Sequence, residues 1–159
     1  MGTLNPNLLS KHASLILNES AKIMPTVGKR LLMPEIVLLG LIRTPDTSAR
    51  RILDKVAQER GFKLSDLDAA TVAQLKTREG RPADFVFVLD NGGKIDLSDE
   101  LLQSIDEALT IQLDLAAQLQ AAGEVDAYVF EELALLYDAK REPAEVARYR
   151  ELYRAITGG

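Results

Sequence analysis

The chain has 159 residues, no Cys and a formal net charge of −5, which fits one domain or two small units that share a core. Without Cys it can form no disulfide bond, no thiolate metal site and no cysteine nucleophile. The sequence contains no run of about 18 apolar residues and no basic-then-apolar leader. We therefore expect a cytoplasmic protein with no membrane partner.

Charge is distributed unevenly along the chain. Residues 1–63 hold ten Lys and Arg against five Asp and Glu, whereas the remainder holds nine against nineteen. Such asymmetry is typical either of a partner surface or of solvated helix faces. An acidic chain with four Tyr, four Phe and no Trp lacks the concentrated basic stripe that nucleic acid requires, so we expect no nucleic-acid partner.

The first predicted helix begins at Asn5 and Pro6. Asn caps free backbone N–H groups, and Pro suits the first helical position. The helix should end near Met24, because Pro25 cannot continue it.

A second helix is expected from Pro34 to Ile42. Its residues are apolar almost all round, which places it at the centre of the domain. A third helix should begin at Thr47 or Ser48 and end at Gly61, the residue type that most readily takes a left-handed cap.

A fourth helix is predicted to run through Leu75. Ser65, with Asp68 three residues later, resembles a capping box at its start. These four helices form the first predicted repeat, residues 4–76.

Residues 77–96 have a different composition. Phe85–Leu89 is a β-branched and aromatic run, Asp90–Gly93 has turn composition, and Lys94–Leu97 alternates polar and apolar residues. Together they predict a β-hairpin inserted between the repeats. Deleting residues 83–96 is therefore expected to leave the helices intact while changing partner binding.

The second predicted repeat, residues 97–157, begins with a helix capped by Ser98 that ends near Gly123. An apolar helix from Asp126 to Tyr137 follows, and Pro143 begins the last helix. The predicted buried stripe of that last helix is Val146, Tyr149, Leu152, Tyr153 and Ile156.

The two halves share an apolar pattern. At an offset of 92, six positions of the first helix and six of the Ser98 helix are all apolar: Leu9, Ala13, Ile16, Leu17, Ala21 and Met24 match Leu101, Ile105, Ala108, Leu109, Leu113 and Ala116. Internal similarity of this kind is typical of repeats. The predicted fold is a single all-α domain, residues 1–159, made of a pseudo-two-fold tandem repeat with seven to eight helices and the inserted hairpin.

The segment from Gly28 to Leu41 reads Gly-Lys-Arg-Leu-Leu-Met-Pro-Glu-Ile-Val-Leu-Leu-Gly-Leu. It resembles the N-terminal repeat domain of the Clp family of AAA+ unfoldases, where Gly-His-x-x-Ile/Val-x-Thr-Glu-His precedes Leu-Leu-Leu-Ala/Gly-Leu. Leu4-Asn5-Pro6 is similar to the family's Leu-Thr-Pro opening, and Leu97-Ser98-Asp99 to a second copy of it. The resemblance covers nearly the whole chain.

Several positions depart from the family pattern. Lys29 and Ile36 stand where the family has His, and Pro34 stands in place of Thr. In the second repeat, Asp126-Ala127-Tyr128 replaces Thr-Glu-His. The chain is therefore similar to a divergent member of the family.

The resemblance implies a non-catalytic domain that recognises protein substrates or adaptors for a AAA+ ATPase ring. In some members a phosphoarginine tag binds each repeat through the opening Thr and the Glu of the motif. Carried over by position, the ligand-binding residues would be Asn5 and Glu35, with Ser98 in the second repeat, where Ala127 replaces the carboxylate. Glu35 also fits a plain first-turn acid that the helix dipole favours.

The remaining residues do not predict catalysis. His12 is the only histidine, the phosphate-loop pattern Gly-x-x-x-x-Gly-Lys-Ser/Thr is missing, and the seven carboxylates between Asp84 and Glu107 do not follow metal-ligand spacing. We therefore expect no enzyme activity, no cofactor and no metal site in this chain.

The hairpin is a candidate partner surface. Phe85, Phe87 and Leu89 share one face of the predicted strand, which either binds a partner or packs on the domain. The alternative function is a free-standing Clp-like adaptor or regulatory protein that docks on the Clp machine or on another protein. The Gly158-Gly159 end would suit a linker to a longer chain.

Overall fold

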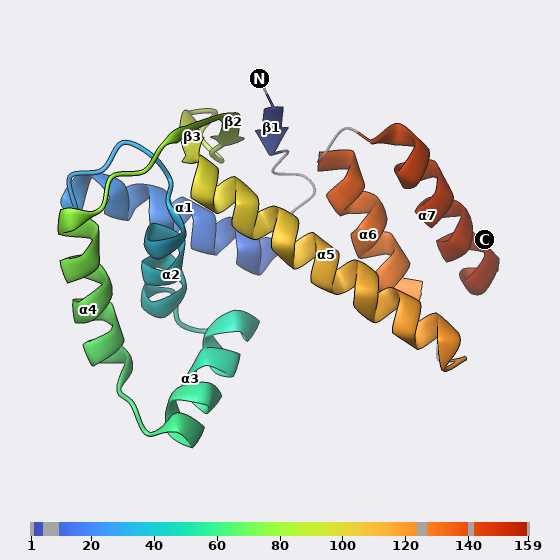
Figure 1. Cartoon of the computed structure of the whole chain (residues 1–159), viewed down its shortest axis with the longest axis horizontal. Coiled ribbons are helices and arrows are strands. Elements are labelled where there is room, and N and C mark those ends of the chain that lie inside the picture. Colours follow the sequence, from blue (N-terminus) through green and yellow to red (C-terminus); the bar gives the residue numbers. More distant parts are fainter. Residues whose placement is uncertain (1, 5–9, 124–126, 140–141, 159) are drawn as a thin grey trace. The chain divides into compact units, whose positions relative to one another are not determined.

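The computed structural model describes residues 2–4, 10–123, 127–139 and 142–158. These residues are mostly helical and include a small antiparallel hairpin (Figure 1). Apart from its first two residues, the chain divides into two compact units, Thr3–Leu102 and Gln103–Gly159, here called the N-terminal and C-terminal units. The predicted tandem repeat remains a prediction.

Within the described residues, the N-terminal unit contains four helices, the three strands apart from Gly2, and the beginning of α5. In chain order they are β1 (Gly2–Leu4), α1 (Lys11–Thr26), α2 (Pro34–Arg43), α3 (Ser48–Arg60), α4 (Leu64–Thr77), β2 (Pro82–Val88), β3 (Lys94–Ser98) and α5 (Asp99–Ala121). The strand order in the sheet is β1-β2-β3.

Helix α1 begins later than the sequence predicts. Its N-cap is Ser10, whose Oγ accepts a hydrogen bond from the Ala13 N–H at 3.1 Å. The predicted start at Asn5 and Pro6 lies outside the described residues. Helix α1 also extends through Pro25 to Thr26, because a Pro in the last turn removes only one intrahelical hydrogen bond.

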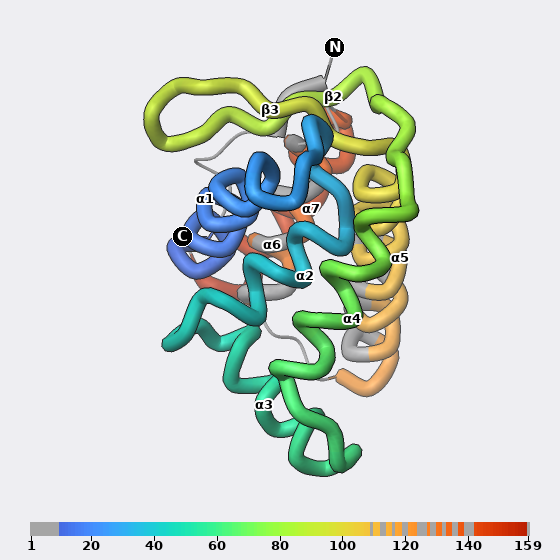
Figure 2. The backbone as a smooth tube through the Cα atoms, turned by 90° about the vertical axis from the view of Figure 1, so that its left-hand side faces the viewer, coloured from blue at the N-terminus to red at the C-terminus, as the bar shows by residue number. Residues whose placement is uncertain are grey.

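Helix α2 is the centre of the N-terminal unit, as predicted. It packs against α1, α3 and α4 (Figures 1 and 2), and Ile36 and Leu39 are fully buried. Gly40 allows the backbones of α1 and α2 to approach closely. A Cβ at this position would overlap Ser20 Oγ and lie 2.8 Å from the Ile16 carbonyl oxygen.

Helix α3 has the predicted ends. Thr47 Oγ1 accepts a hydrogen bond from the Arg50 N–H at 3.1 Å, and Gly61 ends the helix with a φ of 73°, a conformation that glycine adopts without strain.

Helix α4 does not have the predicted capping box. Its N-cap is Lys63, without a side-chain hydrogen bond, and Ser65 lies inside the helix. Two hydrogen bonds from the Arg43 guanidinium to Asp68, at 2.7 and 2.8 Å, connect α4 to α2 instead. Such a bidentate pair is stronger than a neutral hydrogen bond, so tertiary pairing replaces the expected local cap.

The predicted hairpin is confirmed, with Val86 opposite Asp96 and Phe87 opposite Ile95. In its turn, the Gly92 N–H donates to the Leu89 oxygen at 2.9 Å, and Gly92 has a φ of 80° that suits glycine.

The hairpin belongs to the core of the N-terminal unit. Phe87 and Leu97 are fully buried and Val86 is 4% exposed. Leu32, just before α2, donates to the Asp96 oxygen at 2.9 Å and accepts from the Ser98 N–H at 3.0 Å. The structure argues against the expectation that the hairpin could be deleted without disturbing the helices, because its removal would empty a core position and break this backbone pairing.

The C-terminal unit contains the remainder of α5 together with α6 (Ala127–Ala139) and α7 (Pro143–Thr157). The last two helices pack through Phe130, Leu133, Ala134 and Tyr149. In the predicted stripe of α7, Val146 and Tyr149 are buried and Leu152 and Tyr153 are half-buried, but Ile156 is 43% exposed. Ile156 is therefore not a core residue, because it lies in the last turn of the helix.

Candidate functional site

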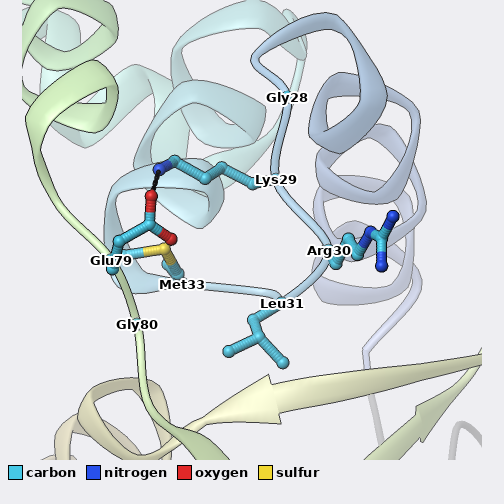
Figure 3. A pocket seen from close by; sticks show the side chains of 7 residues that line it. All are labelled: Gly28, Lys29, Arg30, Leu31, Met33, Glu79 and Gly80. Atoms are coloured by element: carbon cyan, nitrogen blue, oxygen red, sulfur yellow. Dashed lines mark hydrogen bonds and ion pairs between the residues drawn. The ribbon is translucent and has the colours of Figure 1, made fainter.

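A cavity of about 330 Å³ opens between the α1–α2 loop and the segment that follows α4. Its walls combine apolar, charged and glycine residues (Figure 3): Gly28, Lys29, Arg30, Leu31, Met33, Glu79 and Gly80. The volume is at the small end of the range for ligand pockets, about 300–1,000 Å³. It fits a side chain or a short piece of polypeptide.

Two glycines give the cavity its shape. Gly28 has a φ of 68° just after α1, where an L side chain would be strained. Gly80 lies close to Ser98 and Met33. A Cβ at this position would lie 3.2 Å from the Ser98 Cβ and 3.3 Å from the Met33 Sδ. The loop and the segment after α4 can therefore approach each other closely.

Lys29 is the fixed cation of the cavity. Its Nζ donates to the Arg78 carbonyl oxygen at 2.6 Å and to Glu79 Oε1 at 3.1 Å, and its side chain is 9% exposed. An ammonium group has three N–H donors, so two of the three are used. The Glu79 carboxylate is 89% exposed and can accept further hydrogen bonds.

Arg30 and Leu31 complete the wall on the loop side. Figure 3 shows the Arg30 guanidinium directed away from the Lys29–Glu79 pair, whereas Leu31 lies on the side of the hairpin. Met33, on the other side, is 1% exposed. The cavity therefore has an apolar floor and one polar edge.

Glu35 is buried and already paired. It lies in the first turn of α2, is 8% exposed, and forms an ion pair with Arg78, the residue that follows α4. Its Oε2 is buried and has no hydrogen-bond partner among the described residues, a cost that the positive end of the α2 dipole offsets in part. A ligand guanidinium could reach this carboxylate only by displacing Arg78.

The other residues carried over from the resemblance lie outside the described residues or at the starts of helices. Asn5 lies outside the described residues. Ser98 is fully buried, and its Oγ accepts the Leu101 N–H at 3.2 Å as the N-cap of α5. Ala127 is the first residue of α6 and belongs to the C-terminal unit. Neither Glu35 nor Ser98 lines the cavity.

The predicted partner surface on the hairpin is only partly accessible. Phe85 and Leu89 are half-buried, but Phe87 is fully buried. Its ring takes part in the core, which agrees with the alternative that this side of the strand packs on the domain.

The C-terminal unit has a second cavity, of about 290 Å³, lined by Glu131, Ala134, Arg150, Tyr153 and Arg154. The aromatic cluster beside it is closely packed, with the rings of Tyr137 and Tyr149 stacked at 5.5 Å. Burial raises the pKa of both hydroxyls above its ordinary value. The sequence does not predict this cavity, because Tyr153 belongs to a predicted buried stripe and the other lining residues follow no ligand-binding pattern.

His12 connects two helices. Its Nδ1 lies 3.3 Å from both the backbone nitrogen and the Oγ of Ser48, at the start of α3. Within the described ranges, no three His, Asp or Glu side chains converge as metal ligands. Of the helices in the described part of the chain, none is both long and apolar enough to cross a bilayer.

Comparison with protein-family models, with curated proteins and with solved structures finds no match.

Proposed function

We propose that this chain is a non-catalytic domain that recognises protein substrates or adaptors for a Clp-type AAA+ unfoldase. The observation that carries the proposal is the position of the cavity. It opens at Gly28 to Met33, the beginning of the segment on which the family resemblance rests.

The chemistry of the cavity suits a polypeptide ligand. Leu31 and Met33 offer apolar contacts, Lys29 has one donor left for a carbonyl or carboxylate oxygen, and Glu79 can accept a backbone N–H. An extended chain supplies all three kinds of group at close spacing. A mixed site of this kind binds many sequences weakly, which is what a domain that delivers diverse substrates needs.

In this proposal Glu35 has a supporting role. Its ion pair with Arg78 connects the start of α2 to the end of α4, the two elements next to the cavity walls. The Arg78 carbonyl in turn accepts a hydrogen bond from Lys29. Recognition of phosphoarginine through Glu35 would require this arrangement to open.

The proposal is tested with a fluorescein-labelled, permanently unfolded polypeptide titrated by fluorescence anisotropy. Leu31→Trp places a larger side chain in the cavity, and Glu79→Lys sets a second cation beside Lys29. Each variant is expected to weaken binding by about tenfold, the effect of losing about 1.4 kcal/mol of interaction.

Glu19→Lys is the matched control. Glu19 also forms an ion pair with a Lys, Lys22, but on the exposed surface of α1. The Glu19→Lys protein should bind the polypeptide as tightly as the wild type. Equal affinity of the wild type, Leu31→Trp, Glu79→Lys and Glu19→Lys would show that the cavity takes no part in binding and would remove the proposal.

The alternative function, a free-standing adaptor, is distinguished by an assay in trans. Added as a separate protein, an adaptor should change the rate at which a Clp unfoldase hydrolyses ATP or degrades a labelled substrate. A domain that acts only when covalently joined to the ring should leave both rates unchanged.

A further inference from the structure

Helix α3 presents an uncovered apolar surface. Ile52 is 66% exposed, Val56 is 39% exposed, and Phe62, just beyond the helix, is 37% exposed. Ile52 and Val56 are four residues apart and therefore share one face of the helix. We call Ile52 and Val56 the α3 face.

The fold does not need the α3 face to hold the helix. Ala57 is the buried residue of α3, and its position on the helix turns it well away from Ile52 and Val56. The helix is further attached by its buried N-cap Thr47, by a hydrogen bond from the Arg50 guanidinium to the Ile42 carbonyl, and by the contact between His12 and Ser48.

The segment that carries the α3 face holds more basic than acidic side chains, in a chain whose net charge is −5. Residues 48–63 hold five Lys and Arg against two Asp and Glu, a net charge of +3. Both carboxylates are paired locally, Asp54 with Arg50 at 3.1 Å and Glu59 with Lys55 at 3.9 Å. The three cations left over, Arg51, Arg60 and Lys63, form no ion pair within the described part of the chain.

We infer that the α3 face binds an acidic amphipathic helix of a partner protein. Ile52 and Val56 are one turn apart, so they offer a ridge against which apolar side chains at the same spacing on another helix can pack. Acidic residues beside that stripe would meet Arg51, Arg60 and Lys63. A basic or neutral helix of the same apolar pattern would leave these cations without a partner, so charge selects among helices of similar shape.

The surface is separate from the cavity. Within the N-terminal unit, α3 lies at the end opposite the hairpin (Figures 1 and 2), whereas the cavity lies beside Ser98 at the end of β3. The inference therefore does not depend on the proposed function, and the two sites can be tested independently.

The test is a selection from a random 16-residue peptide display library with the full chain as bait. Peptides that bind the wild type but not Ile52→Asp are sequenced and then titrated individually. The expected sequences are acidic, with apolar residues three or four positions apart. These peptides should bind Ile52→Asp at least tenfold more weakly than they bind the wild type. Their binding to the wild type should also weaken when the salt concentration is raised.

Ile156→Asp is the matched control, because Ile156 is also an exposed isoleucine on a helix, in the C-terminal unit. It should bind the selected peptides like the wild type. Circular dichroism should show both variants folded, since a substitution at an exposed helix position changes stability by only about 0.5 kcal/mol.

Three outcomes would overturn the inference. The first is that no peptide depends on Ile52, and the second is that the dependent peptides are basic or uncharged. The third is that sedimentation shows the wild type associating with itself through Ile52, because the α3 face would then be occupied by a second copy of the chain.

Discussion

The substitution Gly40→Ala is expected to destabilise the protein, although alanine favours helices more than glycine does. In an exposed helix the change would stabilise by about 1 kcal/mol. At this position the new methyl group would overlap Ser20 Oγ and lie 2.8 Å from the Ile16 carbonyl oxygen. Ser20 is fully buried, and its hydroxyl donates to that same carbonyl at 2.7 Å.

The magnitude follows from two costs. Overpacking a closely packed core costs about 1–3 kcal/mol, and displacing a buried hydroxyl from its acceptor costs about 1–3 kcal/mol. After the gain in helix propensity of about 1 kcal/mol, we expect a net loss of about 1–5 kcal/mol. Urea unfolding followed by far-UV circular dichroism measures this loss directly.

The double variant Ser20→Ala, Gly40→Ala separates the two costs. It removes the hydroxyl that the new methyl group would strike but leaves the Ile16 carbonyl in place. Its loss of stability should therefore be smaller than the sum of the two single losses by about 1 kcal/mol or more. A Gly40→Ala protein as stable as the wild type, or more stable, would show that α1 and α2 do not cross closely at Gly40.

The remaining predictions concern the hairpin and two ion pairs. Phe87→Ala should cost about 3–5 kcal/mol in urea unfolding, because the ring is fully buried; a loss below about 1 kcal/mol would place the hairpin outside the core. Arg78→Gln leaves the buried Glu35 carboxylate without its cation and should cost about 1–2 kcal/mol, less than a wholly buried pair because Arg78 is partly exposed. The additional change Glu35→Gln should restore part of this, and no restoration would contradict the pairing. The hydrogen bond from Arg43 holds the pKa of Asp68 below its ordinary value, so the stability it contributes is present above about pH 4 and is lost as the pH falls further. The wild type should therefore lose more stability than Asp68→Asn in an acid titration, and parallel curves would refute the assignment.

The helices and the hairpin could be predicted from the sequence because their signals are local. Pro34, Thr47, Gly61 and Ser98 each act within one turn of backbone, and the structure places a helix end at each of them. The exception at Ser65 shows the limit of such signals. Asp68, the acid of the predicted capping box, pairs with Arg43 instead.

The site could be predicted only in part. The segment that carries the resemblance, Gly28 to Leu41, reaches the cavity through its first residues, but Glu35, the residue within it that was expected to bind a ligand, does not line the cavity. Its opposite wall, Glu79 and Gly80, had the composition of a plain loop, and nothing local indicates that it returns to Lys29 across about fifty residues. For the same reason the partner of Glu35 was not foreseen, since Arg78 lies 43 positions away. Long-range pairs of this kind depend on the fold rather than on spacing.

The central claim, that the cavity recognises polypeptide, is tested most directly by nuclear magnetic resonance. Amide shifts of the ¹⁵N-labelled chain are followed while an unlabelled, permanently unfolded polypeptide is added. The account predicts saturable shifts that concentrate at Gly28 to Met33 and at Glu79 and Gly80, and that disappear in Leu31→Trp. Unchanged amides at these positions, with shifts confined to α3 or to the C-terminal unit, would contradict it.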